Sequence, residues 1–157
     1  MEDYNSPEKV AERDSQADPI VMYIIVRESL VEAMGIGKTG IQIGHAVQMV
    51  VSDLSLIKEW IEAEYVPPRD LPKLEYFLSR HPDLILYEKW LKTSYRKVAL
   101  KANDREWEKL KIEFKDTLQL VKDSGLTKIP PGSETVIGLP PMLKSQRPKI
   151  LKRLQAL

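Results

Sequence analysis

The chain has 157 residues, of which 43% are apolar and 30% are charged, a size and composition typical of one globular domain. It contains no cysteine, which excludes disulfides, zinc–thiolate sites and cysteine nucleophiles. No apolar run approaches the roughly 20 residues that a membrane-spanning helix needs, and the stretch Met1–Tyr4 is acidic. We therefore expect neither a membrane span nor a signal peptide.

Charge is distributed unevenly along the chain, although the formal net charge is only +1. Residues 1–90 hold nine Lys and Arg against sixteen Asp and Glu, a net charge of −7. Residues 91–157 hold fifteen against seven, a net charge of +8. A basic half is one signature of a protein that binds a polyanion, but a solvated lysine-rich surface gives the same pattern.

The first third of the chain predicts a tail, a strand and a helix. Residues 1–18 are polar and acidic without apolar periodicity, which indicates a disordered tail before a domain of residues 19–157. The apolar run Ile20–Val26 is typical of a strand buried on both faces. A glycine loop at 33–37 then leads into a helix from Lys38 to about Val51. The expected apolar stripe of this helix is Ile43, Val47, Val50 and Leu54, and Lys38, Gln42, His45 and Met49 share another face.

The remainder predicts a helical insertion and then alternating strands and helices. Three helical pieces are expected at 54–64, 71–79 and 82–92, separated by prolines, and residues 54–80 form the insertion. Strands are expected at 95–102, 117–122 and 134–139. Asn103 and Glu106 form a capping-box pattern that opens a helix, and Pro148 opens a last helix that runs to Leu157.

This order of elements indicates an α/β fold. We expect a small, mixed, four-stranded sheet covered by helices on both faces, giving three layers, with the helical insertion after the first helix.

All seven glycines lie in two short segments, 35–44 and 125–138. Glycine is used where the backbone takes positive φ or approaches another group closely. Two glycine-rich loops that each follow a strand suggest that both loops meet at one site, but tight turns alone explain them equally well.

The stretch Gly35–Gly40 satisfies the G-x-G-x-x-G pattern of dinucleotide-binding folds, and Gly37-Lys38-Thr39 is similar to the end of a phosphate-binding loop. Seven residues separate Gly35 from the strand, and no acidic residue ends a second strand about 20 residues later. Glu32 stands where the phosphate-binding loop needs glycine. We reject nucleotide hydrolysis, keep nucleotide binding as a third hypothesis, and retain an anion site at the helix N-terminus.

Two segments together resemble one family. The stretch Met34–Ala46, MGIGKTGIQIGHA, is similar to the M-G-K-G-K-x-A-x-Q-x-x-H-A signature of the second-class peptidyl-tRNA hydrolases of archaea and eukaryotes. The stretch Asp123–Pro141, DSGLTKIPPGSETVIGLPP, is similar to that family's D-A-G-R-T-x-I-x-P-G signature and its continuation. Between them, Lys97–Lys101 resembles the family's K-[IV]-V-L-K strand, and the match runs in order from about Ile20 to Leu157.

The resemblance implies an enzyme that cleaves the ester between a peptide and the terminal ribose of tRNA without a metal or other cofactor. It implies that Asp123 activates or orients water and that Lys38 supplies positive charge to the oxyanion or to a terminal phosphate. Thr127 and Thr135 would bind substrate or orient Asp123, and His45 is either a proton shuttle or a structural histidine. The substrate-binding residues implied are Gly37, Gln42, Gly125, Gly132 and Ser133.

Several positions depart from the family pattern. Ile36 stands for a signature lysine, Leu126 for the usual arginine and Gly40 for the usual alanine. These departures motivate an alternative hypothesis, a catalytically inactive relative that acts as an RNA- or tRNA-binding module. For either hypothesis the expected partner is tRNA in the cytoplasm, no membrane is involved, and the family often pairs as homodimers.

Overall fold

The computed structural model describes residues 18–64, 66–72, 75–76, 80–93, 95–125 and 128–157, so the predicted tail lies outside the described residues except for Asp18. Within these ranges one sheet has the order β3–β4–β1–β2–β6, and the short strand β5 pairs with β1 off this path. The strands are β1 (Ile20–Arg27), β2 (Lys97–Ala102), β3 (Gln119–Lys122), β4 (Glu134–Gly138), β5 (Met142–Leu143) and β6 (Gln155–Ala156).

Strand β1 is the centre of the sheet, which explains its continuous apolar sequence. Its side chains alternate between two hydrophobic clusters, so that each face of the strand is covered. Ile20, Met22, Ile24 and Val26 belong to one cluster, and Val21, Tyr23 and Ile25 to the other.

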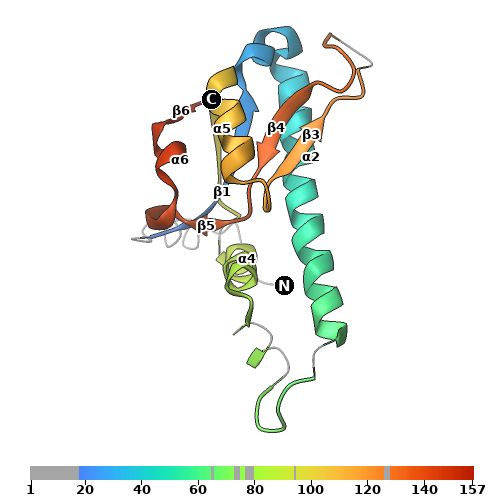
Figure 1. Ribbon diagram of the computed structural model, residues 1–157, viewed down its shortest axis with the longest axis vertical. Helices are drawn as coiled ribbons and strands as arrows, with labels where there is room; N and C mark the ends of the chain where they lie inside the picture. The colour runs from blue at the N-terminus through green and yellow to red at the C-terminus, as the bar shows by residue number, and fades with distance from the viewer. Residues whose placement is uncertain (1–17, 65, 73–74, 77–79, 94, 126–127) are drawn as a thin grey trace.

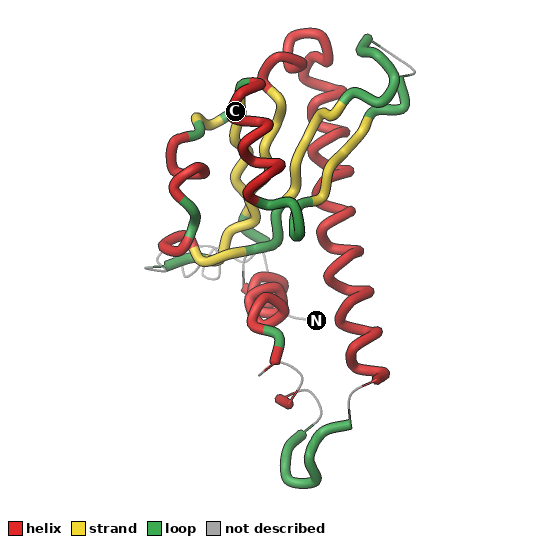
Figure 2. Tube along the Cα trace, viewed as in Figure 1, coloured by secondary structure: helices red, strands yellow, loops and turns green. Residues whose placement is uncertain are grey.

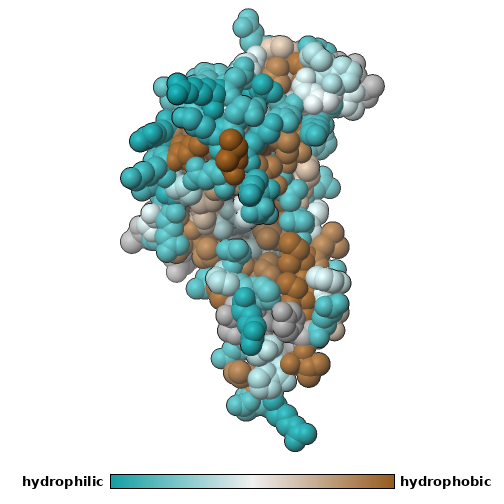
Figure 3. All heavy atoms as spheres, in the orientation of Figure 1, coloured by the Kyte–Doolittle hydropathy of each residue, from teal (hydrophilic) through white to brown (hydrophobic). Residues whose placement is uncertain are grey.

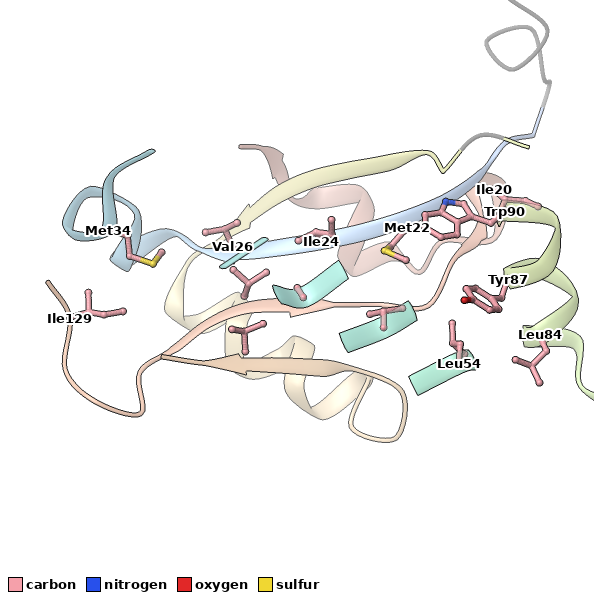
Figure 4. Packing of buried hydrophobic residues seen from close by; sticks show 14 residues of the cluster. Ile20, Met22, Ile24, Val26, Met34, Leu54, Leu84, Tyr87, Trp90 and Ile129 are labelled. Atoms are coloured by element: carbon pink, nitrogen blue, oxygen red, sulfur yellow. The ribbon is translucent and has the colours of Figure 1, made fainter. Parts of the chain in front are cut away.

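Helices cover both faces of the sheet, and the predicted three-layer α/β fold is confirmed (Figure 1). The first cluster joins the sheet to α2 (Glu28–Glu64) and α4 (Pro82–Thr93). Figure 4 shows this cluster from Met34 and Ile129 at one end to Trp90, Tyr87 and Leu84 at the other. The second cluster joins the sheet to α5 (Asp104–Glu113) and α6 (Lys149–Arg153).

The sheet is mixed, as predicted, but its described part has six strands where four were expected, because the short strands β5 and β6 pair with β1 and β2. β1 and β2 are parallel, so the chain must cross over between them, and α2 and α4 form that crossover on one face. The pairs β1–β4, β3–β4 and β2–β6 are antiparallel. The carboxyl end of β1, the first half of α2 and the β3–β4 connection therefore lie at the same end of the domain (Figure 1).

Helix α2 is longer than predicted in both directions. The expected loop at 33–37 is wrong, because the helix begins at Glu28 and only Gly35 leaves helical geometry, with φ 70° and ψ 174°. The helix then continues to Glu64, so the segments predicted at 38–51 and 54–64 are one element that projects beyond the strands (Figure 2). A single glycine at positive φ is enough to redirect a helix, which the sequence pattern alone does not distinguish from a loop.

The predicted buried stripe of α2 is also partly wrong. Val50 and Leu54 are buried as expected, but Ile43 and Val47 are only partly buried. The buried positions nearer the start of the helix are Met34, Thr39, Gln42 and Ala46. The helix therefore buries a glutamine and a threonine, where sequence periodicity placed aliphatic side chains.

Near α5 and the chain end, one prediction is confirmed and another is wrong. The capping box is present, with Glu106 N–H bonded to Asn103 Oδ1 at 2.9 Å and Asn103 N–H bonded to Glu106 Oε2 at 2.9 Å. The predicted last helix ends at Arg153 instead of Leu157. The following residues pair with β2 as β6, because strand β2 otherwise leaves an edge of unpaired backbone groups.

The far half of α2 packs against α4. Tyr87 Oη lies 2.8 Å from Ser55 Oγ, and Lys58 forms an ion pair with Glu88. Leu56 and Trp60 remain exposed there, and Figure 3 shows apolar surface gathered over this lower part of the molecule. The helix predicted at 71–79 falls largely outside the described residues, whereas α4 occupies the third predicted piece.

Candidate active site

A carboxylate and an ammonium group meet where β3 ends and the first half of α2 passes over it. Lys38 Nζ lies 3.1 Å from Asp123 Oδ1, and the two side chains are 13% and 6% exposed. Asp123 directly follows β3, while Lys38 lies three residues after the break at Gly35. The two glycine-rich segments of the sequence are thus brought together at one place.

Three donors from the described part of the chain bond to the Asp123 carboxylate. Oδ1 accepts from Gln42 Nε2 at 3.3 Å as well as from Lys38, and Oδ2 accepts the Gly125 backbone N–H at 2.7 Å. A carboxylate oxygen has two lone pairs. Among the described residues, Oδ1 has two partners, whereas Oδ2 accepts only the Gly125 N–H and keeps a lone pair beyond that bond.

These donors determine the ionisation of Asp123. Burial alone would raise the pKa of the carboxyl, but the hydrogen bond from Lys38, the Gly125 N–H and the charge of Lys38 outweigh it, and the pKa is lowered below its ordinary value. Asp123 is therefore an anion at neutral pH, held beside a cation in a nearly enclosed position.

Thr135 and Gln42 continue this network beneath the ion pair. Thr135 is fully buried on β4, and its hydroxyl donates to Gln42 Oε1 at 2.7 Å. An amide whose oxygen accepts from Thr135 must direct its NH₂ group the other way, toward Asp123. Thr135 Oγ1 also lies 3.3 Å from the Val121 carbonyl oxygen. The chain of contacts Thr135–Gln42–Asp123 fixes the orientation of the carboxylate.

The β3–β4 connection holds Asp123 through its backbone too. Asp123 N–H donates to Ser133 O at 2.9 Å, and Gly132 N–H donates to Asp123 O at 2.8 Å. Gly125 has φ 75°, and a Cβ atom built there would lie 2.4 Å from Pro131 Cα. The turn that places the Gly125 N–H on the carboxylate therefore requires glycine.

The structure brings some of the predicted site residues together and separates others. Lys38, Gln42, Asp123, Gly125 and Thr135 form the network described above.

Others lie outside that network. His45 is exposed on α2, where it lines a groove beside β3. Gly37 is exposed, and the Ser133 hydroxyl donates to Pro130 O within its own loop at 2.7 Å. Thr127, like Leu126, lies outside the described residues.

Two features were not foreseen from the sequence. The bond from Gly125 N–H to Asp123 is an Asx-type contact, for which Asp-Ser-Gly was an available signal. The hydrogen bond from Thr135 to Gln42 had no such signal, because the residues are 93 positions apart.

The glycine pattern at 35–40 does not form a nucleotide-binding loop. Only Gly35 leaves helical geometry, so this stretch does not wrap around a phosphate as a G-x-G-x-x-G turn does. Within the described ranges, no three His, Asp or Glu side chains gather as a metal site would require. None of the helices in the described part of the chain combines the length and apolar character needed to cross a membrane.

Comparisons with known proteins agree with the resemblance seen in the two motifs. The family model described as peptidyl-tRNA hydrolase PTH2 matches residues 20–157, which is all of the chain except its first 19 residues. A peptidyl-tRNA hydrolase of Methanococcus vannielii is 35% identical over 82 residues, which cover 48% of this chain and 67% of that protein. On this evidence, the chain belongs to the peptidyl-tRNA hydrolase PTH2 family.

Proposed function

We propose that this protein hydrolyses the ester bond of peptidyl-tRNA without a metal ion, releasing the peptide and recycling the tRNA. The observation that carries the proposal is the nearly enclosed Lys38–Asp123 pair, which lies within the two motifs that define the family resemblance. Ester hydrolysis needs an oriented water and a positive charge for the tetrahedral oxyanion, and the pair supplies both.

Asp123 is the group that holds the water. Its second oxygen keeps a lone pair that can accept a hydrogen bond from water, and the Gly125 N–H fixes the direction of that lone pair. As the water oxygen attacks the ester carbonyl, Asp123 accepts the proton that the water loses. Because its pKa is lowered, protonated Asp123 readily gives this proton to the leaving ribose oxygen, which balances the reaction.

Lys38 supplies the positive charge that a metal ion supplies in other hydrolases. Its ammonium lies 3.1 Å from Asp123 and stays partly shielded from water, so its interaction with a nearby oxyanion is weakly screened. Gln42 and Thr135 act as positioning residues, because their contacts hold the carboxylate without requiring contact with the substrate.

The substrate and its surroundings follow from this reaction. The +8 charge of residues 91–157 supports tRNA binding, which should weaken steeply as salt rises. A protein that acts on peptidyl-tRNA works where translation occurs, and we propose the cytoplasm as its location. The homodimer stays a prediction, which light scattering of the purified protein would test.

Single-turnover cleavage of N-acetylaminoacyl-tRNA in the presence of a chelator tests the proposal. We expect the wild-type chain to cleave with the chelator present and Lys38→Ala to lose most of the rate while remaining folded. Loss of wild-type cleavage on chelation, restored by added metal, would contradict metal independence. A folded wild-type chain that binds the substrate without cleaving it would instead support the binding-module alternative.

A further inference from the structure

A groove of about 420 Å³ lies between α2 and β3, beside the candidate active site. Its lining residues are His45, Gln48, Met49, Ser52, Leu120, Val121 and Lys122. Lys122 directly precedes Asp123, so one end of the groove adjoins the ion pair. Gln48 lies six residues beyond Gln42, about 9 Å along the helix axis. One end of the groove therefore lies beside the site of chemistry, and the rest follows α2 away from it.

One wall of this groove is an open strand edge. β3 is the first strand in the sheet order, and among the described residues no strand pairs with its other side. The backbone N–H and C=O of Asp123 both face the β4 side, where they bond to Ser133 and Gly132. Because backbone groups alternate along a strand, those of Lys122 and Leu120 point away from β4, toward the open edge.

We propose that the groove binds the peptide half of the substrate as an extended strand that adds to the free edge of β3. This inference rests on the proposed function. An enzyme that recycles peptidyl-tRNA meets many peptide sequences, and pairing through the main chain recognises a peptide independently of its side chains. An extended residue spans about 3.3 Å, so the four residues of β3 match three or four residues of peptide.

The lining of the groove favours a peptide over the single-stranded end of the tRNA. Proteins that bind single strands combine several cations with aromatic side chains on which bases stack. Among the described residues, those that line this groove include one lysine and no Phe, Tyr or Trp. Its hydrogen-bonding side chains and open backbone edge instead match the polar main chain of a peptide.

The first test varies the substrate and leaves the protein unchanged. tRNA that carries a four-residue peptide is compared with N-acetylaminoacyl-tRNA, and we expect the longer substrate to have a kcat/KM about tenfold higher. N-methylation of single peptide nitrogens should lower kcat/KM by about fivefold at alternate positions only, since one main-chain hydrogen bond is lost at each. Changes of peptide side chain at the same positions should have smaller effects.

The second test blocks the groove. In Gln48→Trp, which places an indole ring at about the third peptide residue, we expect the advantage of the longer substrate to fall to about one. The control is Asp53→Trp, which places the same ring on an exposed position of α2 that does not line the groove, and it should retain the advantage.

The outcomes separate this inference from the function on which it rests. Equal cleavage of the two substrates by the wild type, or N-methylation effects without alternation, would overturn the groove assignment alone. A Gln48→Trp variant that loses the same factor on both substrates and binds uncharged tRNA more weakly would place RNA in the groove and also overturn it. No cleavage of either substrate would overturn the proposed function, and this inference with it.

Discussion

Gly125→Ala perturbs the turn that positions the candidate catalytic carboxylate. Gly125 has φ 75°, and an added Cβ would lie 2.4 Å from Pro131 Cα and 2.6 Å from Pro131 N. These are backbone atoms, so the overlap is relieved only if the loop moves. Such movement withdraws the N–H that bonds to Asp123 Oδ2 at 2.7 Å.

The neighbouring Gly132 provides a matched control for the size of this effect. It has φ 78°, but no atom of the described residues, apart from its two chain neighbours, lies within 4 Å of its Cβ position. Gly132→Ala therefore carries only the cost of left-handed backbone, about 1–2 kcal/mol. In a chain of this length that corresponds to a fall in Tm of roughly 2–8 °C. Gly125→Ala adds the steric overlap with Pro131 to this cost, so we expect a larger fall in Tm. We also expect the rate of ester cleavage to fall on the order of tenfold.

Thermal unfolding and single-turnover cleavage on the same preparations measure both quantities. Gly40→Ala serves as a further control, because its Cβ position is open and the helix should gain about 0.5–1 kcal/mol. If Gly125→Ala and Gly132→Ala had the same Tm and the same cleavage rate, the close approach of Gly125 to Pro131 would be refuted.

Three further predictions follow from the network and its surroundings. Thr135→Val removes the hydroxyl that donates to the buried Gln42 Oε1, and it should destabilise the protein by about 1–3 kcal/mol and slow cleavage. Thr135→Ser keeps the hydroxyl and should keep the stability and the cleavage rate of the wild type. Equal Tm values for the two variants would count against the network. Carboxyl NMR should give Asp123 a pKa below its ordinary value of 3.8. Lys38→Met should raise this pKa, because the effect of burial then dominates. An unchanged titration midpoint of Asp123 in Lys38→Met would contradict the stabilisation of the carboxylate by Lys38. Because the pKa of Asp123 is lowered in the folded state, its ionisation stabilises the fold at pH values above the unfolded-state pKa. This stability is lost as the pH falls through the folded-state pKa. Ile36 is 95% exposed, so Ile36→Lys should leave Tm unchanged. If the new lysine contacts a phosphate, the slope of log K for tRNA binding against log salt concentration should become steeper by about 0.7–0.9. An unchanged slope would exclude a phosphate contact there.

Local patterns in the sequence predicted the elements whose ends are marked by local chemistry. The central strand β1 was found because a strand buried on both faces reads as a continuous apolar run. Helix α5 was found from its capping box. The sequence misplaced α2, because whether Gly35 ends or merely bends a helix depends on what packs on either side of it. Strand β6 was missed because two residues that pair only at a sheet edge have no pattern of their own.

The candidate site was predicted in part for the same reason. Lys38 and Asp123 were singled out by resemblance, but their distance of 3.1 Å depends on how α2 crosses the sheet. Gln42 was assigned to a face of the helix other than the apolar stripe, yet it is buried and joins Asp123 to Thr135. Periodicity assigns buried positions to apolar residues, so it misses a buried polar group whose partners come from distant parts of the chain.

A double-mutant cycle on the ion pair tests the central claim most directly. Single-turnover cleavage of N-acetylaminoacyl-tRNA is measured for the wild type, Asp123→Asn, Lys38→Met and the double variant, each shown to be folded. If the two groups act as one catalytic unit, each single variant should lose nearly as much rate as the double variant. Losses that multiply in the double variant, or an Asp123→Asn chain that cleaves at the wild-type rate, would contradict the assignment of this pair as the active site.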